Sequence, residues 1–345
     1  MQFLSGIVEG FYGREWSWQD RRQTADFLCR QQLNSYLYCP KADSHLRGSW
    51  QEDWPQAVSQ ELSSLASHYR SSHLNWGVGL SPYALYRDYS AVQRQRLQDK
   101  VRRIDDLGGN LLAVLFDDMP GDCPDLARRQ AEIVQDIQLW SGAERLLVCP
   151  TYYSHDPVLE RYFGPRPADY WEDLGADLPA EVDIFWTGNL VCSRSIRKAD
   201  MDAIASRLGR PLVLWDNYPV NDGEKASKFL HLQPLSGREP GLDQCLRGHF
   251  CNPMNQALLS RYPLAGLGAL YGATPLTLEE CFGEAMAAQL VGDMKDFEAG
   301  GLDFLGVDRC RELALTYAEF EHPAAAEVVA WLGGEYRFDP ACLTG

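Results

Sequence analysis

The chain has 345 residues, enough for one large domain with an appendage or for two ordinary domains. Its 48 acidic and 32 basic residues give a formal net charge of −16, which argues against a nucleic acid or an anionic membrane surface as partner, because both would repel it. No segment approaches the roughly 20 consecutive apolar residues of a membrane-spanning helix, and the N-terminus lacks the pattern of an export signal. We therefore expect a soluble, cytoplasmic protein.

The ten cysteines favour the same compartment. None forms a CxxC pair, and several lie inside apolar runs, where cysteine behaves as a small buried hydrophobic residue. We expect free thiols in a reducing environment and no disulfides.

Short apolar runs, each closed by Gly, Pro or polar residues, recur along the chain up to about residue 250 and read as buried strands. The eight runs are residues 3–8, 35–38, 74–80, 111–116, 146–149, 182–186, 211–215 and 248–251.

Helical patterns fill the intervals between these runs. One interval carries Leu62, Leu65, Ala66 and Tyr69 at helical spacing, and similar patterns lie near residues 97–104, 133–140 and 201–208. Eight βα units over about 250 residues predict a TIM barrel, an α/β fold, across residues 1–273. A doubly wound sheet is the alternative, but no GxGxxG turn follows the first run.

Residues 274–345 are expected to form a helical C-terminal extension. Thr277 and Glu280 have the spacing of a capping box, and helical patterns follow at 281–291, 311–320 and 324–332. These helices are short, so we expect them to pack on the barrel rather than to fold alone.

Polar and aromatic residues follow seven of the eight strands, at the barrel end where TIM-barrel enzymes carry their active sites. Rings combined with Asn, Asp and Lys suit a neutral ligand rich in hydroxyl groups, so we expect a sugar. The residues are Glu9, Gly10, Tyr12, Lys41, Asp43, Asp117, Asp118, Thr151, Tyr152, Tyr153, Thr187, Trp215, Asn217, Asp222 and Asn252.

Two of these residues, Asp117 and Asp118, are adjacent. Side chains alternate along a strand, so neighbouring carboxylates share a site only where the strand opens into a loop, and Met119, Pro120 and Gly121 supply that opening. Taken alone, such a pair is more often a solvated loop or a helix cap than a catalytic pair.

Other chemistries fit less well. The seven histidines show no HExxH or HxH spacing, so no metal site is expected, although Asp117, Asp118 and Asp222 could hold a hard cation. The sequence also lacks a GxSxG elbow and a GxxxxGK[ST] loop, which leaves acyl-enzyme and P-loop mechanisms unsupported.

The strand-end motifs, in this order and at roughly this spacing, resemble the family-84 glycoside hydrolases, the O-GlcNAcase and bacterial β-N-acetylglucosaminidase family. They are GIVEGFYG (6–13), YLYCPK (36–41), FDD (116–118), CPT (149–151), WTG (186–188), WDNYPVND (215–222) and NP (252–253). The resemblance implies a retaining TIM-barrel enzyme without a cofactor. Its substrate would be a glycoprotein or glycan with terminal β-linked N-acetylglucosamine, including the sugar on Ser or Thr.

The resemblance also implies catalysis assisted by the substrate, in which the 2-acetamido oxygen attacks C1 and forms an oxazoline. Asp117 would then accept the acetamido N–H, and Asp118 would act as general acid and base. A retaining enzyme with two catalytic carboxylates needs them about 5 to 5.5 Å apart, and substrate assistance removes that need.

The remaining pocket residues are assigned by the same resemblance. Gly10 and Lys41 would bind sugar hydroxyls, Asp222 and Asn252 the 4- and 6-hydroxyls. Tyr153, or its neighbour Tyr152, would hold the acetamido arm. Asn217 would also contact the acetamido arm. Trp215 and Tyr12 would line the pocket.

Two other functions stay open from the sequence: a metal-dependent barrel hydrolase and a non-catalytic barrel that binds N-acetylglucosamine. The physiological aglycone and the oligomeric state also stay open.

Overall fold

The structure is a computed structural model that describes residues 2–338. Eight parallel strands form a closed barrel in which each strand pairs with the next along the chain and the last pairs with the first. The strands are β1 (Leu4–Glu9), β2 (Ser35–Tyr38), β3 (Asn75–Leu80), β4 (Leu111–Leu115), β5 (Arg145–Cys149), β6 (Asp183–Trp186), β7 (Leu212–Asp216) and β8 (Leu246–Cys251).

This barrel confirms the predicted fold class. All eight expected runs are strands, with ends that differ by at most two residues. They were recognisable because a parallel strand inside a ring of helices is buried on both faces, so its sequence is almost continuously apolar. Every residue of β4 is buried, for example.

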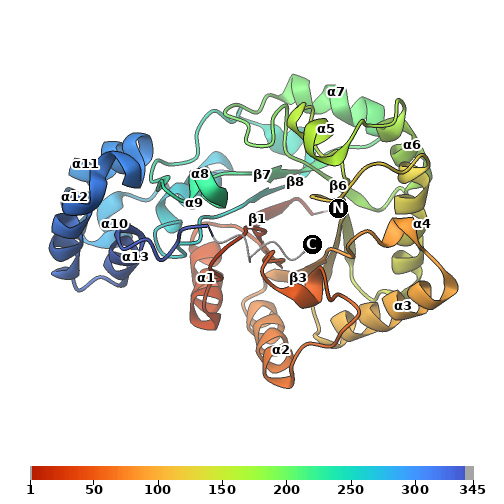
Figure 1. Cartoon of the computed structure of the whole chain (residues 1–345), viewed down its shortest axis with the longest axis horizontal. Helices are drawn as coiled ribbons and strands as arrows, with labels where there is room; N and C mark the ends of the chain where they lie inside the picture. The colour runs from red at the N-terminus through yellow and green to blue at the C-terminus, as the bar shows by residue number, and fades with distance from the viewer. Residues whose placement is uncertain (1, 339–345) are drawn as a thin grey trace.

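Helices connect the strands and surround the barrel (Figure 1). In α2 the residues expected on the buried face, Leu62, Leu65, Ala66 and Tyr69, are the buried ones. The helices of the barrel region are α1 (Trp18–Arg30), α2 (Gln56–Ser71), α3 (Ala91–Asp106), α4 (Leu126–Trp140), α5 (Val158–Phe163), α6 (Tyr170–Asp177), α7 (Lys198–Leu208), α8 (Gly223–Ala226) and α9 (Arg261–Leu270), with short 3₁₀ helices η1 (Ser44–Leu46), η2 (Leu85–Arg87) and η3 (Leu242–Gln244).

The C-terminal helices lie together on one side of the barrel, drawn in blue in Figure 1. They are α10 (Leu278–Phe282), α11 (Glu284–Lys295), the π-helical turn η4 (Asp296–Gly300), α12 (Gly301–Ala318) and α13 (Pro323–Leu332). The capping box of Thr277 and Glu280 is present. The single helix expected over 281–291 is wrong: Gly283, with φ of 77°, separates α10 from α11, because a left-handed residue ends a helix.

A second hydrophobic cluster joins these helices to the barrel. From α11 to α13 it contains residues such as Met286, Phe297 and Trp331, and from the barrel it contains Leu230, Leu232, Met254, Leu258 and Leu259. The barrel residues come from the segments that follow β7 and β8. The division at residue 273 stays a prediction, and residues 339–345 of the predicted extension lie outside the described part of the chain.

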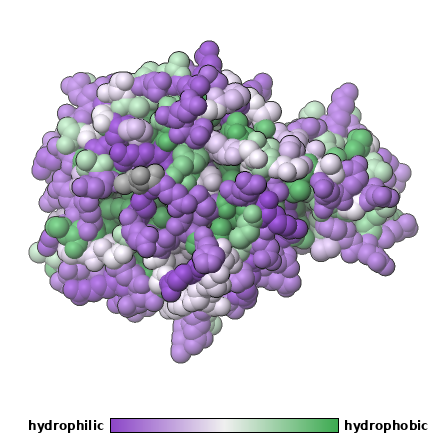
Figure 2. Space-filling view, turned by 180° about the vertical axis from the view of Figure 1, so that it is seen from behind, coloured by the Kyte–Doolittle hydropathy of each residue, from purple (hydrophilic) through white to green (hydrophobic). Residues whose placement is uncertain are grey.

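The surface seen in Figure 2 is mostly hydrophilic over both the barrel and the smaller lobe of C-terminal helices. Within the described residues, every helix is too short or too polar to cross a membrane. The nine described cysteines are all free thiols, and Cys342 lies outside the described residues.

Candidate active site

A cavity of about 200 Å³ opens among the loops that follow the barrel strands. It is lined by all ten residues to which the sequence motifs assign a role in catalysis or sugar binding. They are Gly10, Tyr12, Lys41, Asp117, Asp118, Tyr153, Trp215, Asn217, Asp222 and Asn252.

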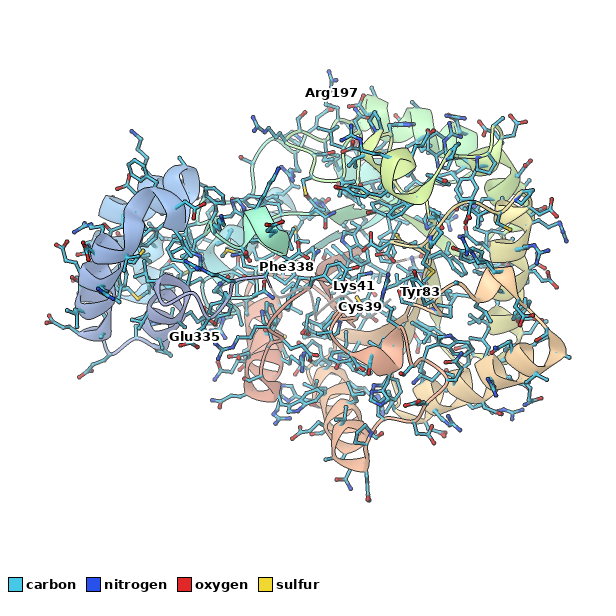
Figure 3. The ribbon with its side chains drawn as sticks, in the orientation of Figure 1. Cys39, Lys41, Tyr83, Arg197, Glu335 and Phe338 are labelled. Carbon is cyan, nitrogen blue, oxygen red and sulfur yellow. The ribbon has the colours of Figure 1, made fainter. Side chains whose placement is uncertain are left out.

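Asp117 forms a buried ion pair with Lys41. The Lys41 Nζ donates to Asp117 Oδ2 at 2.5 Å and lies 3.9 Å from Asp118 Oδ2. Burial disfavours the charged amine, but the two carboxylates together hold the pKa of Lys41 above its ordinary value, so it stays a cation. Lys41 is labelled near the middle of the barrel in Figure 3.

The second oxygen of Asp117 has no such partner. Asp117 Oδ1 is buried and makes no hydrogen bond within the described residues. An unsatisfied buried acceptor is costly and therefore rare. Asp117 lines the cavity, so this acceptor, which has no partner among the described residues, belongs to a side chain that borders the ligand space.

Asp118 is held by two tyrosine hydroxyl groups. Tyr12 Oη donates to Asp118 Oδ2 at 2.9 Å, and Tyr153 Oη to Oδ1 at 3.4 Å. Burial and the negative charge of Asp118 raise the pKa of both tyrosines, so both remain donors. Tyr152 points elsewhere and donates to the carbonyl of Gly164. Of the two neighbouring tyrosines, Tyr153 is therefore the one at the cavity.

The two asparagines of the cavity are linked by hydrogen bonds. Asn252 Oδ1 accepts from the Gly10 N–H at 3.2 Å, and Asn252 Nδ2 donates to Asn217 Oδ1 at 3.1 Å. The same Asn217 oxygen accepts from Trp215 Nε1 at 3.0 Å, and Asn217 Nδ2 donates to the Val191 carbonyl at 2.9 Å. This chain of bonds orders the side chains before any ligand arrives.

Gly10 is required by close packing. A Cβ at this position would lie 2.3 Å from Cζ2 of Trp215, so any side chain would displace the indole from the cavity wall. The contact explains why a glycine follows β1 where the chain turns toward the cavity.

Asp222 ties the loop after β7 to the loop after β1. Its Oδ2 accepts from the Tyr12 N–H at 2.8 Å. Burial raises the pKa of Asp222 to about 6, although the Tyr12 N–H opposes the shift. Asp222 thus changes charge closer to neutrality than an ordinary aspartate.

Five further residues line the cavity, and one of them, Thr187, was already among the strand-end residues that the sequence suggested. Cys149, Thr187 and Val220 stand inside the CPT, WTG and WDNYPVND motifs, so the motifs contained a signal for them. The loop after β6 supplies the other two, Val191 and Cys192, without any recognisable pattern.

A hydrogen-bond network supports the ends of β7 and β8. His249 Nε2 lies 3.0 Å from Asp216 Oδ2 and His249 Nδ1 lies 2.8 Å from Tyr271 Oη, while Arg238 Nε donates to Asp216 Oδ2 at 2.7 Å. With Cys251, Asp216 and His249 have the spacing of metal ligands, the one such group within the described residues. The arginine already neutralises Asp216, so the arrangement suits a structural network better than a cation site.

A family model described as beta-N-acetylglucosaminidase matches residues 5–288. The chain is also 30% identical over 261 residues to two proteins named Protein O-GlcNAcase, from Rattus norvegicus and Mus musculus. The matched region covers 73% of this chain but 28% of each relative, so the chain corresponds to a minor part of their length.

A solved structure, a point mutant of the Thermobaculum terrenum O-GlcNAc hydrolase, is similar over nearly the whole chain. The similarity has a TM-score of 0.78 and 26% sequence identity, and it covers 97% of this chain and 81% of the other. With the family model matching most of the chain and its motif residues gathered in one cavity, the chain belongs to the beta-N-acetylglucosaminidase family.

Proposed function

We propose that the protein is a retaining exo-β-N-acetylglucosaminidase that removes terminal β-linked N-acetylglucosamine, including the sugar attached to Ser or Thr of proteins. The observation that carries this proposal is that the adjacent residues Asp117 and Asp118 line one cavity, while one oxygen of Asp117 is left without a hydrogen-bond partner among the described residues. The names of the similar proteins support the same substrate.

In the first step the substrate's acetamido oxygen attacks C1. The bond from C1 to the aglycone oxygen breaks, and Asp118 donates its proton to the departing oxygen. Asp117 Oδ1 accepts the acetamido N–H, which orients the arm and stabilises the positive charge that develops on it as the ring closes to the oxazolinium form of the intermediate. Lys41, bound to the other oxygen of Asp117, keeps that carboxylate in place.

In the second step water attacks C1 and Asp118 takes its proton. The bond from C1 to the acetamido oxygen breaks, so the acetamido group is restored and the product keeps the β configuration. Two displacements at the same carbon give retention without a carboxylate nucleophile.

The rest of the cavity binds the sugar. Tyr153 and Asn217 hold the acetamido arm, and Asp222 and Asn252 bind the 4- and 6-hydroxyls. Gly10, through its carbonyl, and Lys41 bind further hydroxyls. The aromatic rings that line the pocket against the C–H faces of the sugar are Tyr12 and Trp215.

The substrates of this proposal are glycoproteins or glycans, and no cofactor takes part. A reducing compartment such as the cytoplasm belongs to the same proposal, because the nine described cysteines are all free.

The proposal is tested with the wild type, Asp118→Asn and Asp117→Asn on an O-GlcNAc peptide and on 4-nitrophenyl β-N-acetylglucosaminide. We expect turnover of both by the wild type. Asp118→Asn should lose about 10²–10⁴-fold in kcat/KM on the peptide, the usual contribution of a general acid, and less on the activated aryl glycoside. Asp117→Asn should lose activity on both, because the acetamido arm assists in both reactions.

Other outcomes identify the alternatives. Calorimetric binding of N-acetylglucosamine without turnover of either substrate would indicate a sugar-binding barrel. Loss of activity on chelation, restored by a divalent cation, would indicate a metal-dependent hydrolase. An α-configured first product, seen by NMR, would exclude the retaining mechanism.

A further inference from the structure

A buried arginine that is not part of the cavity lining contacts the backbone of Asp118. Arg47 follows η1 in the loop after β2 and is 4% exposed. Its Nη2 donates to the main-chain carbonyl of Asp118 at 2.7 Å. Arg47 does not line the cavity, so it would act on the reaction only through another residue.

The backbone that Arg47 holds is unusual. Asp118 has a φ of 53°, in the left-handed region that residues other than glycine seldom adopt. Along an extended strand, neighbouring side chains point to opposite faces. The left-handed turn at Asp118 interrupts that alternation, and both carboxyl groups line the same cavity.

The hydroxyl groups that bind Asp118 come from other loops. Tyr12 and Tyr153 donate to its carboxyl oxygens, and about a quarter of the side chain, 28%, is exposed. These contacts orient the carboxyl group but do not determine the backbone conformation. The bond from Arg47 to the Asp118 carbonyl is the side-chain contact that acts on the backbone directly.

Arg47 is itself positioned by a third loop. Its guanidinium lies over the ring of Tyr83, 5.2 Å from the centroid, in the loop after β3. Tyr83 is labelled beside the middle of the barrel in Figure 3. The Nε and Nη1 atoms of Arg47 are buried and make no hydrogen bond within the described residues. The structure thus accepts two unsatisfied donors on a buried cation, a cost that points to a functional reason for placing it there.

We propose that Arg47 is a positioning residue for Asp118, which keeps the backbone of Asp118 in the left-handed conformation that aims its carboxyl group at the departing oxygen. This inference rests on the proposed function, in which Asp118 is the general acid. Loss of Arg47 lets the backbone relax toward an extended conformation and moves the acid away from the oxygen that it protonates.

The effect of losing Arg47 should depend on the leaving group of the substrate. A substrate with a good leaving group needs little protonation, whereas a poor leaving group depends on the acid. A misplaced acid therefore slows poor substrates most, and displacements of about 1 Å can cost on the order of 10²-fold. A purely structural defect would reduce turnover of all substrates by a similar factor.

The test is a series of aryl β-N-acetylglucosaminides whose phenols span a wide range of pKa, assayed with the wild type, Arg47→Met and Arg47→Lys. We expect Arg47→Met to lose about 10–100-fold in kcat/KM on the poorest leaving groups and little on the best, so that log kcat/KM falls more steeply with leaving-group pKa. Arg47→Lys, which keeps one donor but not the planar group, should lie between.

Arg210→Met is the matched structural control. Arg210 is also buried, at 9% exposure, and donates to main-chain carbonyls, those of Gly175, Leu178, Pro179 and Val182. It precedes β7, at the barrel end opposite the cavity. Arg210→Met should lower the melting temperature but leave the slope of log kcat/KM against leaving-group pKa as in the wild type.

The outcomes separate this inference from the proposed function. An equal loss on all leaving groups in Arg47→Met, with a slope like that of the wild type, overturns the inference. Asp118→Asn is measured on the same series: if its slope is also unchanged, Asp118 is not the general acid and the proposed mechanism fails first. If Arg47→Met does not fold, the slope of Arg47→Lys decides. A slope steeper than that of the wild type supports the inference, and a slope equal to that of the wild type contradicts it.

Discussion

At the residue scale, Asp117 and Asp118 differ in their partners although they are neighbours. One oxygen of Asp117 is bound to the Lys41 cation, and the other is buried without a partner. Asp118 instead accepts from two neutral hydroxyl groups, those of Tyr12 and Tyr153. The Lys41 cation lies 2.5 Å from Asp117 and 3.9 Å from Asp118, so Asp117 is the carboxylate held directly by the ion pair, which suits a fixed acceptor.

Asp222 should control the acid side of the pH profile. Burial raises the pKa of Asp222 to about 6, so it is an anion above that pH and neutral below it. If the anion binds sugar hydroxyls, kcat/KM should fall as the pH drops through about 6, since the neutral acid is a weaker acceptor. The measurement is kcat/KM from pH 4.5 to 8 for the wild type and Asp222→Asn.

The amide in Asp222→Asn cannot ionise, so kcat/KM of this variant should not fall near pH 6. Its kcat/KM should be lower than that of the wild type at every pH. Lys225→Met is a suitable control, since Lys225 is exposed in the adjacent helix α8 and should leave the profile as in the wild type. An acid limb near pH 6 that persists in Asp222→Asn would assign the titration to another group.

At the scale of elements, α13 is fastened to the segment after β8. Glu327 of α13 accepts from the N–H of Leu258 at 3.0 and 3.1 Å, one bond to each oxygen, and from the N–H of Leu259 at 2.9 Å. Trp331 of the same helix donates to the Ser227 carbonyl at 3.2 Å, in the segment after β7. The C-terminal helices therefore hold the two loops that carry Asn252, Asn217 and Asp222.

Replacing Glu327 by Ala should reduce the free energy of unfolding by about 1–3 kcal/mol, because it leaves buried N–H groups without an acceptor. Denaturant unfolding measures this change. The exposed Glu335 near the end of the described chain offers a control, and Glu335→Ala should lose well under 1 kcal/mol, since its ion pair with Arg14 is exposed on both sides.

The same residue predicts a pH dependence of stability. Burial raises the pKa of Glu327 from its ordinary 4.5 to about 7, so the folded protein prefers the protonated form. Its contribution is fully present below about pH 4.5 and is lost as the pH rises through about 7. The melting temperature of Glu327→Gln relative to the wild type should therefore rise between pH 5 and 8, and a constant difference would contradict the assignment.

At the scale of the whole molecule, the barrel and the C-terminal helices share a hydrophobic cluster. The barrel contributes side chains that are almost fully buried there, among them Leu230, Leu232, Met254 and Leu259, each 0% exposed. Without the helices these side chains would form an exposed apolar surface. The C-terminal helices therefore cover these side chains and complete the hydrophobic core on this side of the barrel.

We expect a truncated chain of residues 1–273 to be insoluble, or to lack a cooperative thermal transition, when prepared in parallel with the full chain. The reason is the loss of the apolar burial that stabilises the loops after β7 and β8. A soluble truncated chain that melts cooperatively and retains glycosidase activity would show that the barrel folds without the extension.

The barrel and most of its cavity could be predicted from the sequence. Strands buried on both faces leave continuous apolar runs, and a parallel barrel brings the residues after those runs to one end. Asp117 and Asp118 were predicted as neighbours in the site, and the other eight residues predicted for it line the same cavity.

Contacts between distant segments could not be predicted, because no local pattern encodes them. The choice of Tyr153 over Tyr152 depends on which ring faces Asp118, and the wall formed by Val191 and Cys192 depends on the path of an irregular loop. Arg47 reaches the Asp118 carbonyl across 71 positions of sequence. Strand positions follow from local periodicity, whereas the aim of the carboxyl groups follows from long-range packing of loops, which the tertiary structure alone decides.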